Sequence, residues 1–113
     1  MCSQSVLKEI TDKVVQAAKD SLGDKLDKVF LYGSYARGDH NEESDIDIMV
    51  LADIPRVDRG IEREKMRKLL GYVDLELDIV LSINITDCTT FYKYLRVEPF
   101  FQNVLRDGVV LSA

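Results

Sequence analysis

Residues 28–37 read KVFLYGSYAR, and residues 44–51 read SDIDIMVL. The apolar run at 28–33 is short and uninterrupted, which is typical of a strand that is buried on both faces. It ends at Gly33-Ser34, and the residues that follow can begin a helix. These two stretches decide the fold, because the first predicts a strand that turns into a helix and the second predicts another strand.

The second strand, predicted at 45–52, carries two carboxylates on one face. Side chains alternate along a strand, so Asp45 and Asp47 share a face with Met49 and Leu51, whereas Ile46, Ile48 and Val50 point to the other side. Neighbouring carboxylates repel one another and lose hydration when they are buried. A divalent cation with oxygen ligands relieves both costs. The alternative is a strand end at which both aspartates are simply hydrated.

The Gly33-Ser34 pair predicts a phosphate-binding turn. Glycine allows the backbone to approach a ligand closely, and the start of a helix offers backbone N–H groups without partners. The Ser34 hydroxyl adds a donor at the same place. A Gly-Ser pair taken alone is more often an ordinary turn, so the prediction depends on the aspartates that follow.

A third carboxylate comes from the stretch 73–82, VDLELDIVLS, which alternates between apolar and acidic residues and predicts a strand. If this strand lies beside 45–52, Asp78 joins Asp45 and Asp47. Three carboxylates at one edge of a sheet are typical of two-metal nucleotidyl transfer. Asp74 and Glu76 share the polar face and compete for this role, but Ile79-Val80-Leu81 follow Asp78 and favour it.

The remaining segments predict helices and one short strand. Apolar spacing predicts a helix at 3–22, with Ser3 or Ser5 as its N-cap and Gly23 at its end. Helices are also predicted at 58–71, 86–95 and 99–107, with a polar loop at 39–44 and a short strand or packed tail at 109–111. In the 58–71 helix the predicted inward residues are Ile61, Met66, Leu69 and Leu70. The order predicts one small α/β (α+β) domain over 1–113, with a mixed sheet of three to four strands packed against helices.

Composition restricts the class of protein. The net charge of -5 gives no long-range attraction to nucleic acid, so direct nucleic-acid binding is not expected. No apolar run is long enough to span a membrane, and the first ten residues contain no signal-peptide stretch. Cys2 and Cys88 fit no metal or redox spacing and are interpreted as free thiols. We therefore expect a soluble, cytoplasmic protein.

Gly33-Ser34, followed after ten residues by Asp45-x-Asp47, resembles the signature of the nucleotidyltransferase superfamily related to DNA polymerase beta. The longer stretches around both motifs resemble its minimal nucleotidyltransferase (MNT) branch. The resemblance implies the nucleotidyltransferase fold, with ATP as substrate and two Mg²⁺ ions as cofactors. It also implies that Gly33 and Ser34 hold the triphosphate, while Asp45, Asp47 and Asp78 bind the metal ions.

Further roles are implied by the same resemblance. Asp78 would help to deprotonate the attacking hydroxyl. Arg37 would contact phosphate or brace the loop, although pairing with Asp39 or Glu43 is an equal alternative. Many relatives carry a second basic residue where this chain has Tyr35, which weakens the case for a second cationic contact there.

The resemblance implies a partner as well: a HEPN-domain toxin that the MNT protein silences by transferring AMP from ATP to a tyrosine of the toxin. Two alternatives remain, namely an antitoxin that acts by binding alone and a small-molecule transferase of the antibiotic type. The aromatic residues Phe91, Tyr92, Tyr94, Phe100 and Phe101 predict either core packing or a homodimer contact. The single histidine, His40, is expected to be exposed.

Overall fold

A mixed sheet with the strand order β3-β2-β1-β4 lies at the centre of the protein. The computed structural model describes residues 3–41 and 43–112, so Cys2 and Glu42, within the predicted 39–44 loop, lie outside the described residues. The strands are β1 (Leu26–Tyr32), β2 (Ile46–Ala52), β3 (Leu81–Asp87) and β4 (Val109–Ser112). The helices are α1 (Gln4–Leu22), α2 (Ser34–Arg37), α3 (Arg59–Leu70), α4 (Val73–Glu76), α5 (Cys88–Tyr94) and α6 (Pro99–Asp107), with 3-10 turns at Gly23–Lys25 and Arg56–Asp58.

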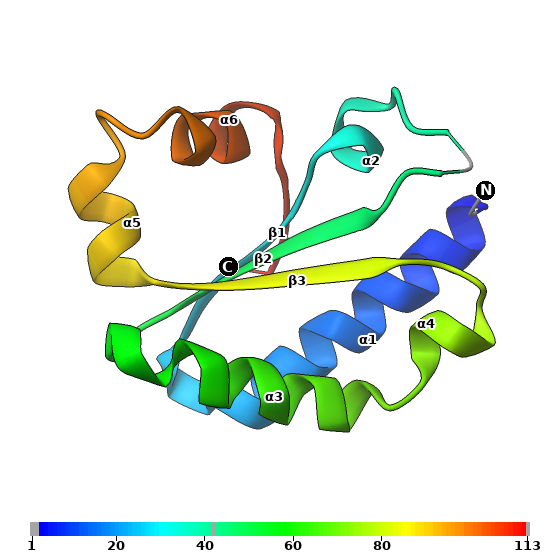
Figure 1. Ribbon diagram of the computed structural model, residues 1–113, viewed down its shortest axis with the longest axis horizontal. Coiled ribbons are helices and arrows are strands. Elements are labelled where there is room, and N and C mark those ends of the chain that lie inside the picture. Colours follow the sequence, from blue (N-terminus) through cyan, green and yellow to red (C-terminus); the bar gives the residue numbers. More distant parts are fainter. Residues whose placement is uncertain (1–2, 42, 113) are drawn as a thin grey trace.

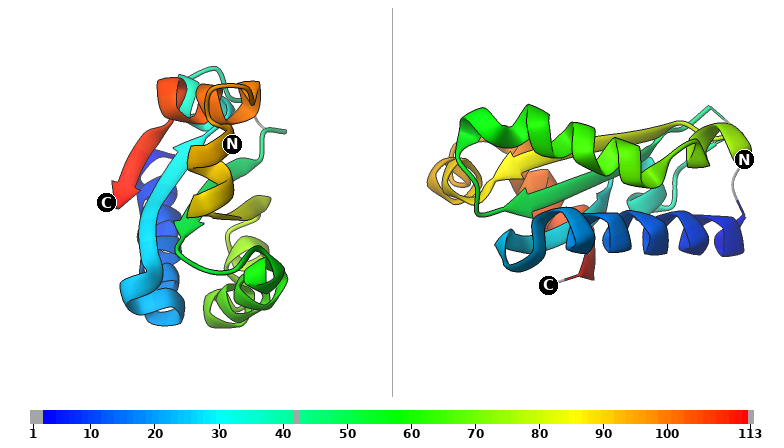
Figure 2. Two further views of the ribbon diagram at one scale, coloured as in Figure 1. Left: turned by 90° about the vertical axis from the view of Figure 1, so that its left-hand side faces the viewer. Right: turned by 90° about the horizontal axis from the view of Figure 1, so that it is seen from below.

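Helices cover the sheet on both faces (Figure 1). α1 and α3 lie side by side on one face, whereas α5 and α6 cover part of the other (Figure 2). The alternation in β2 explains the two layers, because Ile48 and Val50 enter the core beneath α1 and α3, while Met49 and Leu51 join a second core cluster with Phe30. The predicted division of β2 into two faces is confirmed, and so is the small mixed sheet.

The first helix begins and ends as the sequence predicts. Ser3 is the N-cap, and its hydroxyl accepts a hydrogen bond of 3.2 Å from the Val6 N–H. Gly23 follows the last turn with a φ of 55°, a conformation that glycine adopts without strain. Ile10, Val14 and Ala18 on the inner face of this helix are fully buried, so its apolar face anchors it on the sheet.

α3 lies along the β3 edge of the sheet, and the prediction of its inward face is partly wrong. Met66 is fully buried, but Ile61 and Leu69 are more than half exposed. Its arginines instead face the strand edge. Arg63 Nε donates a hydrogen bond of 2.9 Å to the Ile83 carbonyl oxygen, and Arg67 donates one of 3.4 Å to that of Leu81. These bonds satisfy carbonyl groups that an edge strand leaves unpaired.

The predicted strand at 73–82 is wrong. Residues Val73–Glu76 form the short helix α4, and the third strand begins at Leu81. Leucine and glutamate favour helix, and Val73 and Leu77, four residues apart, both pack on the core. The stretch 81–87 also alternates, and its β-branched residues Ile83, Ile85 and Thr86 suit a strand better. β3 then pairs in parallel with β2.

The last third of the chain forms helices and a final strand, as predicted. β4 pairs antiparallel with β1 at the other edge of the sheet. Phe91 is fully buried, and its ring centroid lies 4.9 Å from that of Phe101. The core interpretation therefore holds for these two rings. Tyr92, Tyr94 and Phe100 are exposed, and a homodimer contact through them stays a prediction. In the described part of the chain, no helix is long and apolar enough to cross a membrane.

The buried ring of Phe91 gives a test of the second core cluster. We expect Phe91→Ala to lower the free energy of unfolding by about 3–5 kcal/mol, because it removes buried apolar surface and leaves a cavity. Val57→Ala is the matched control, since Val57 is 86% exposed and its truncation should change stability by less than about 0.5 kcal/mol. Urea denaturation measures both, and equal midpoints for Phe91→Ala and the parent protein would contradict the packing.

Candidate active site

The turn between β1 and α2 touches Asp47, the aspartate of β2. Tyr32 and Asp47 are register partners in the antiparallel β1–β2 pair, so Gly33 follows directly beside Asp47. Gly33 has a φ of 75°, and a Cβ built on it would collide with the Asp47 carboxylate oxygen Oδ2. Only glycine combines this backbone conformation with room for the carboxylate. The two predicted motifs therefore meet in space.

The start of α2 presents backbone donors beside this contact. The N–H groups of Ala36 and Arg37 both donate to the Gly33 carbonyl oxygen at 3.1 Å. The N–H groups of Ser34 and Tyr35 precede the first helical bonds and have no acceptor within α2. Because α2 has only four residues, it offers N–H groups and the Ser34 hydroxyl rather than a strong helix dipole. This is the arrangement expected of a phosphate-binding turn.

The environment of Asp47 disfavours the negative charge of its carboxylate. Burial raises the pKa of Asp47, the charge of Asp45 raises it further, and the Arg37 guanidinium acts in the opposite direction. Asp45 is exposed and precedes the first residue of β2. A carboxylate whose ionisation is disfavoured, next to a second carboxylate, suits a divalent cation, since the cation supplies the missing positive charge. Asp45 and Asp47 therefore fit as ligands of Mg²⁺.

Asp78 does not lie on a strand beside the other two aspartates. It is in the turn between α4 and β3 and has a φ of 52°. Because β3 begins at Leu81, the residue paired with Asp47 is Ser82. Within residues 3–41 and 43–112, no group of three or more His, Cys, Asp or Glu side chains is placed to hold a metal ion. This conformation does not bring Asp78 to the other two aspartates. Its metal-binding role therefore stays a prediction.

Arg37 forms the pairing with Asp39 that the sequence leaves open, while its contact with phosphate stays a prediction. Its Nε donates a hydrogen bond of 3.2 Å to Asp39, and the two form an ion pair. It also lines a hollow of about 230 Å³ together with Gly33, Tyr32, Phe100 and Asp107. We call this cavity the Gly33 hollow. Arg37 thus braces the loop and still presents its charge at the phosphate-binding turn.

The sequence did not predict a role for the polar side chains that surround Asp47 on the open face of the sheet. Tyr32 is half-buried, and burial and the charge of Asp47 raise its pKa, while a hydrogen bond with Asn84 lowers it. Tyr32 and Asn84 line a second hollow of about 380 Å³ with Ser82, Arg59 and Arg63. We call it the Arg59 hollow. The alternation of Ser82 and Asn84 in 81–87 was the available signal, and the misplaced third strand concealed it.

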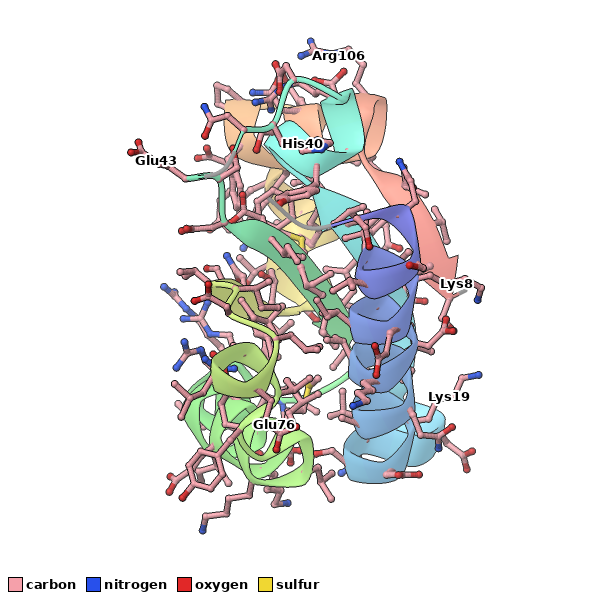
Figure 3. All side chains as sticks on the ribbon, turned by 90° about the vertical axis from the view of Figure 1, so that its right-hand side faces the viewer. Lys8, Lys19, His40, Glu43, Glu76 and Arg106 are labelled. Carbon is pink, nitrogen blue, oxygen red and sulfur yellow. The ribbon has the colours of Figure 1, made fainter. Side chains whose placement is uncertain are left out.

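His40 departs from the expectation of an exposed loop residue. Its ring stacks on that of Tyr35, with centroids 4.1 Å apart and planes 10° apart, and it lies beside α2 in Figure 3. Its Nδ1 atom is buried without a hydrogen-bond partner among the described residues. The stacking holds the loop that joins the phosphate-binding turn to the carboxylates.

Comparison with known proteins shows the family of this chain. The family model described as "Nucleotidyltransferase domain" matches residues 11–106. The chain belongs to the nucleotidyltransferase domain family. This confirms the resemblance to nucleotidyltransferases, the fold class and the enzyme class drawn from the sequence.

Several relatives of this nucleotidyltransferase have more specific names. A provisionally named protein adenylyltransferase of Methanocaldococcus jannaschii is 37% identical over 97 residues, which cover 86% of this chain and 89% of the relative. Protein adenylyltransferase MntA of Shewanella oneidensis is 35% identical over 69 residues, which cover 61% of this chain and 48% of MntA. A crystal structure of a toxin-antitoxin with AMP-PNP superimposes with a TM-score of 0.56 at 25% identity, covering 91% of this chain and 73% of that one.

The Gly33–Asp47 contact can be tested against a second glycine. Gly33→Ala should destabilise the protein and abolish binding of Mg·ATP, because it adds backbone strain and displaces the Asp47 carboxylate. Gly38 also has a positive φ, but nothing lies within 4 Å of a Cβ placed there. Gly38→Ala should cost about 1–2 kcal/mol of backbone strain and retain nucleotide affinity. Calorimetric titration with ATP separates the two, and unchanged affinity in Gly33→Ala would contradict the contact.

The raised pKa of Asp47 predicts a stability that depends on pH. The pKa of Asp47 is higher in the folded protein than in the unfolded one. Its ionisation therefore lowers the stability of the fold as the pH rises from the unfolded pKa through the folded pKa. Asp47→Asn should therefore be more stable than the parent protein at pH 7 without divalent cations, and this advantage should vanish below the ordinary Asp pKa of about 3.9. Denaturant unfolding in chelator at both pH values measures it. Asp12→Asn on the exposed face of α1 should show no comparable gain, and a loss of stability in Asp47→Asn at pH 7 would contradict the electrostatic argument.

Proposed function

We propose that this nucleotidyltransferase transfers AMP from ATP to a tyrosine hydroxyl of a partner protein, a HEPN-domain toxin, and acts as its antitoxin. The observation that carries the proposal is the contact between Gly33 and the Asp47 carboxylate, which joins a phosphate-binding turn to a pair of metal-binding carboxylates. The names of the relatives support the choice of acceptor, since they include protein adenylyltransferases, and a toxin-antitoxin structure shares the fold. Since ATP is the substrate, we place the reaction in the cytoplasm.

Each side chain has a role in this reaction. The Ser34 hydroxyl, the first N–H groups of α2 and the Arg37 guanidinium bind the triphosphate. Asp45 and Asp47 hold Mg²⁺. When bound, the ions lower the pKa of the acceptor hydroxyl and stabilise charge on the departing pyrophosphate. The acceptor oxygen forms a bond to the α-phosphorus, and the bond to pyrophosphate breaks on the opposite side.

Asp78 is proposed as the group that receives the proton of the acceptor hydroxyl. It is exposed and lies two residues before Val80, whose carbonyl oxygen accepts a 2.8 Å hydrogen bond from the Ile46 N–H. Asp78 is therefore at the same end of the sheet as Asp45. Rearrangement of residues 77–80 would carry its carboxylate toward the pair. We also propose that, once Asp78 lies beside Asp45 and Asp47, the site holds two Mg²⁺ ions rather than one.

Transfer of labelled AMP tests the proposed reaction. With α-labelled ATP, Mg²⁺ and the co-purified partner, we expect label on the partner and none in chelator. Asp47→Asn should reduce the rate by more than about 100-fold, which is the upper end of the cost of removing a group that only supports a metal ligand. Asp24→Asn, a change at an exposed carboxylate distant from the site, is the matched control and should keep the full rate.

The same variants separate catalysis from binding alone. If Asp47→Asn still protects cells from the toxin while transferring no AMP, the protein neutralises its partner by binding and the catalytic proposal is wrong. Asp78→Asn tests the third carboxylate. A full transfer rate in this variant would remove Asp78 from the mechanism and leave the pair of Asp45 and Asp47.

A further inference from the structure

The arginine wall of the Arg59 hollow lies across β2 from Gly33, whereas its Tyr32 wall adjoins Gly33. In the sheet order β3-β2-β1-β4, the neighbours of Asp47 are Tyr32 on β1 and Ser82 on β3. Gly33 continues from β1, whereas Ser82, Asn84, Arg59 and Arg63 belong to β3 and α3. Asp47 thus separates two surfaces, one that binds phosphate and one whose ligand is not yet assigned.

The geometry of displacement at phosphorus places the pyrophosphate and the acceptor hydroxyl on different surfaces. The attacking and leaving oxygens lie on opposite sides of the α-phosphorus. Pyrophosphate leaves on the side of Gly33 and Ser34. The acceptor hydroxyl must then approach from the β3 side, past Ser82 and Asn84, where the Arg59 hollow opens.

The charge of the Arg59 hollow is unlike that of the chain as a whole. Among the residues that the structure describes, no carboxylate lines it, although the net charge of the chain is -5. Arg59 and Arg63 are one helical turn apart on α3. Neither forms an ion pair within 4.0 Å among the described residues; each uses its Nε to bind a backbone carbonyl oxygen, of Arg56 and Ile83 respectively. Arg59 also interacts electrostatically with Asp87. The remaining guanidinium N–H groups are the donors that carboxylates bind most strongly.

We propose that the Arg59 hollow binds the acceptor segment of the partner protein and recognises an acidic side chain next to the accepting hydroxyl. The inference rests on the proposed transfer to a protein. Arg59 and Arg63 form the charged wall, and the Asn84 amide and Ser82 hydroxyl offer hydrogen bonds beside Asp47. Because the net charge of the chain is -5, an acidic segment is repelled by the protein as a whole and attracted to this pair of arginines.

The experiment uses a glutamate–tyrosine copolymer as an acidic acceptor and a neutral alanine–tyrosine copolymer as its counterpart. Binding is measured by fluorescence anisotropy, and AMP transfer by labelled ATP with Mg²⁺. The variants are Arg59→Gln and Arg63→Gln. Lys68→Gln is the control, since Lys68 is on the exposed side of α3. Arg63→Lys keeps the charge, and thermal melting checks that every variant folds.

We expect the parent protein to bind the acidic polymer at least about tenfold more tightly than the neutral one, and each glutamine variant to lose about three- to tenfold of that affinity, as removal of a charge-assisted contact predicts. Added salt should weaken the binding. Lys68→Gln should behave as the parent protein does, and the KM for ATP should not change in any variant.

Three results would overturn the inference. Equal affinity for the two polymers would show that the hollow does not select acidic segments. Full affinity in both glutamine variants of folded protein would remove the arginines from the interface. A raised KM for ATP with unchanged polymer binding would assign the arginines to the triphosphate instead. Failure of the proposed function is distinct, because it appears as polymer binding that depends on Arg59 and Arg63 without transfer of label.

Discussion

The close approach of Gly33 to the Asp47 carboxylate is the constraint on which the site depends. It exists because Tyr32 and Asp47 are partners in the β1–β2 pair. A slip of one residue would turn Val29, Leu31, Ile48 and Val50 out of the core, so burial of these side chains fixes the register. The same packing that stabilises the sheet therefore places the Gly33-Ser34 turn against a carboxylate, and no separate interaction is needed to assemble them.

The electrostatics of the site follow from this placement. Asp47 is drawn into a partly buried position next to Asp45, and the structure offers only the guanidinium of Arg37 in compensation. Arg37 is itself paired with Asp39. The free protein thus contains a cluster of negative charge that a cation and a triphosphate can occupy together, since the cation neutralises both the aspartates and the phosphate oxygens. Function here costs stability in the absence of ligand, as at many active sites.

The sequence predicted the segments in which local pattern and tertiary environment agree. The β1–α2–β2 segment is of this kind, because a buried strand, a glycine turn and an alternating strand follow one another within 27 residues, from Leu26 to Ala52. Prediction from the sequence failed where the tertiary environment decides the local structure. Alternation in 73–82 concealed a helical turn, and the inward face of α3 was misjudged because a helix at a sheet edge packs arginines against backbone carbonyl groups. Ser82 and Asn84 escaped notice because the third strand was predicted at 73–82, whereas it begins at Leu81.

The position of Asp78 shows why alternation alone cannot specify such a site. In an extended chain, residues 78, 80, 82 and 84 share one face, so a shift of β3 by two residues would keep Leu81, Ile83 and Ile85 in the core and bring Asp78 opposite Asp45. Periodicity fits both registers. What selects the observed one is outside the strand: Val73 and Leu77 hold α4 on the core, and Arg67 pairs with Asp74 at 3.1 Å. The position of Asp78 relative to Asp45 and Asp47 is therefore set by a short helix outside the strand, which a periodic pattern within the strand cannot reveal.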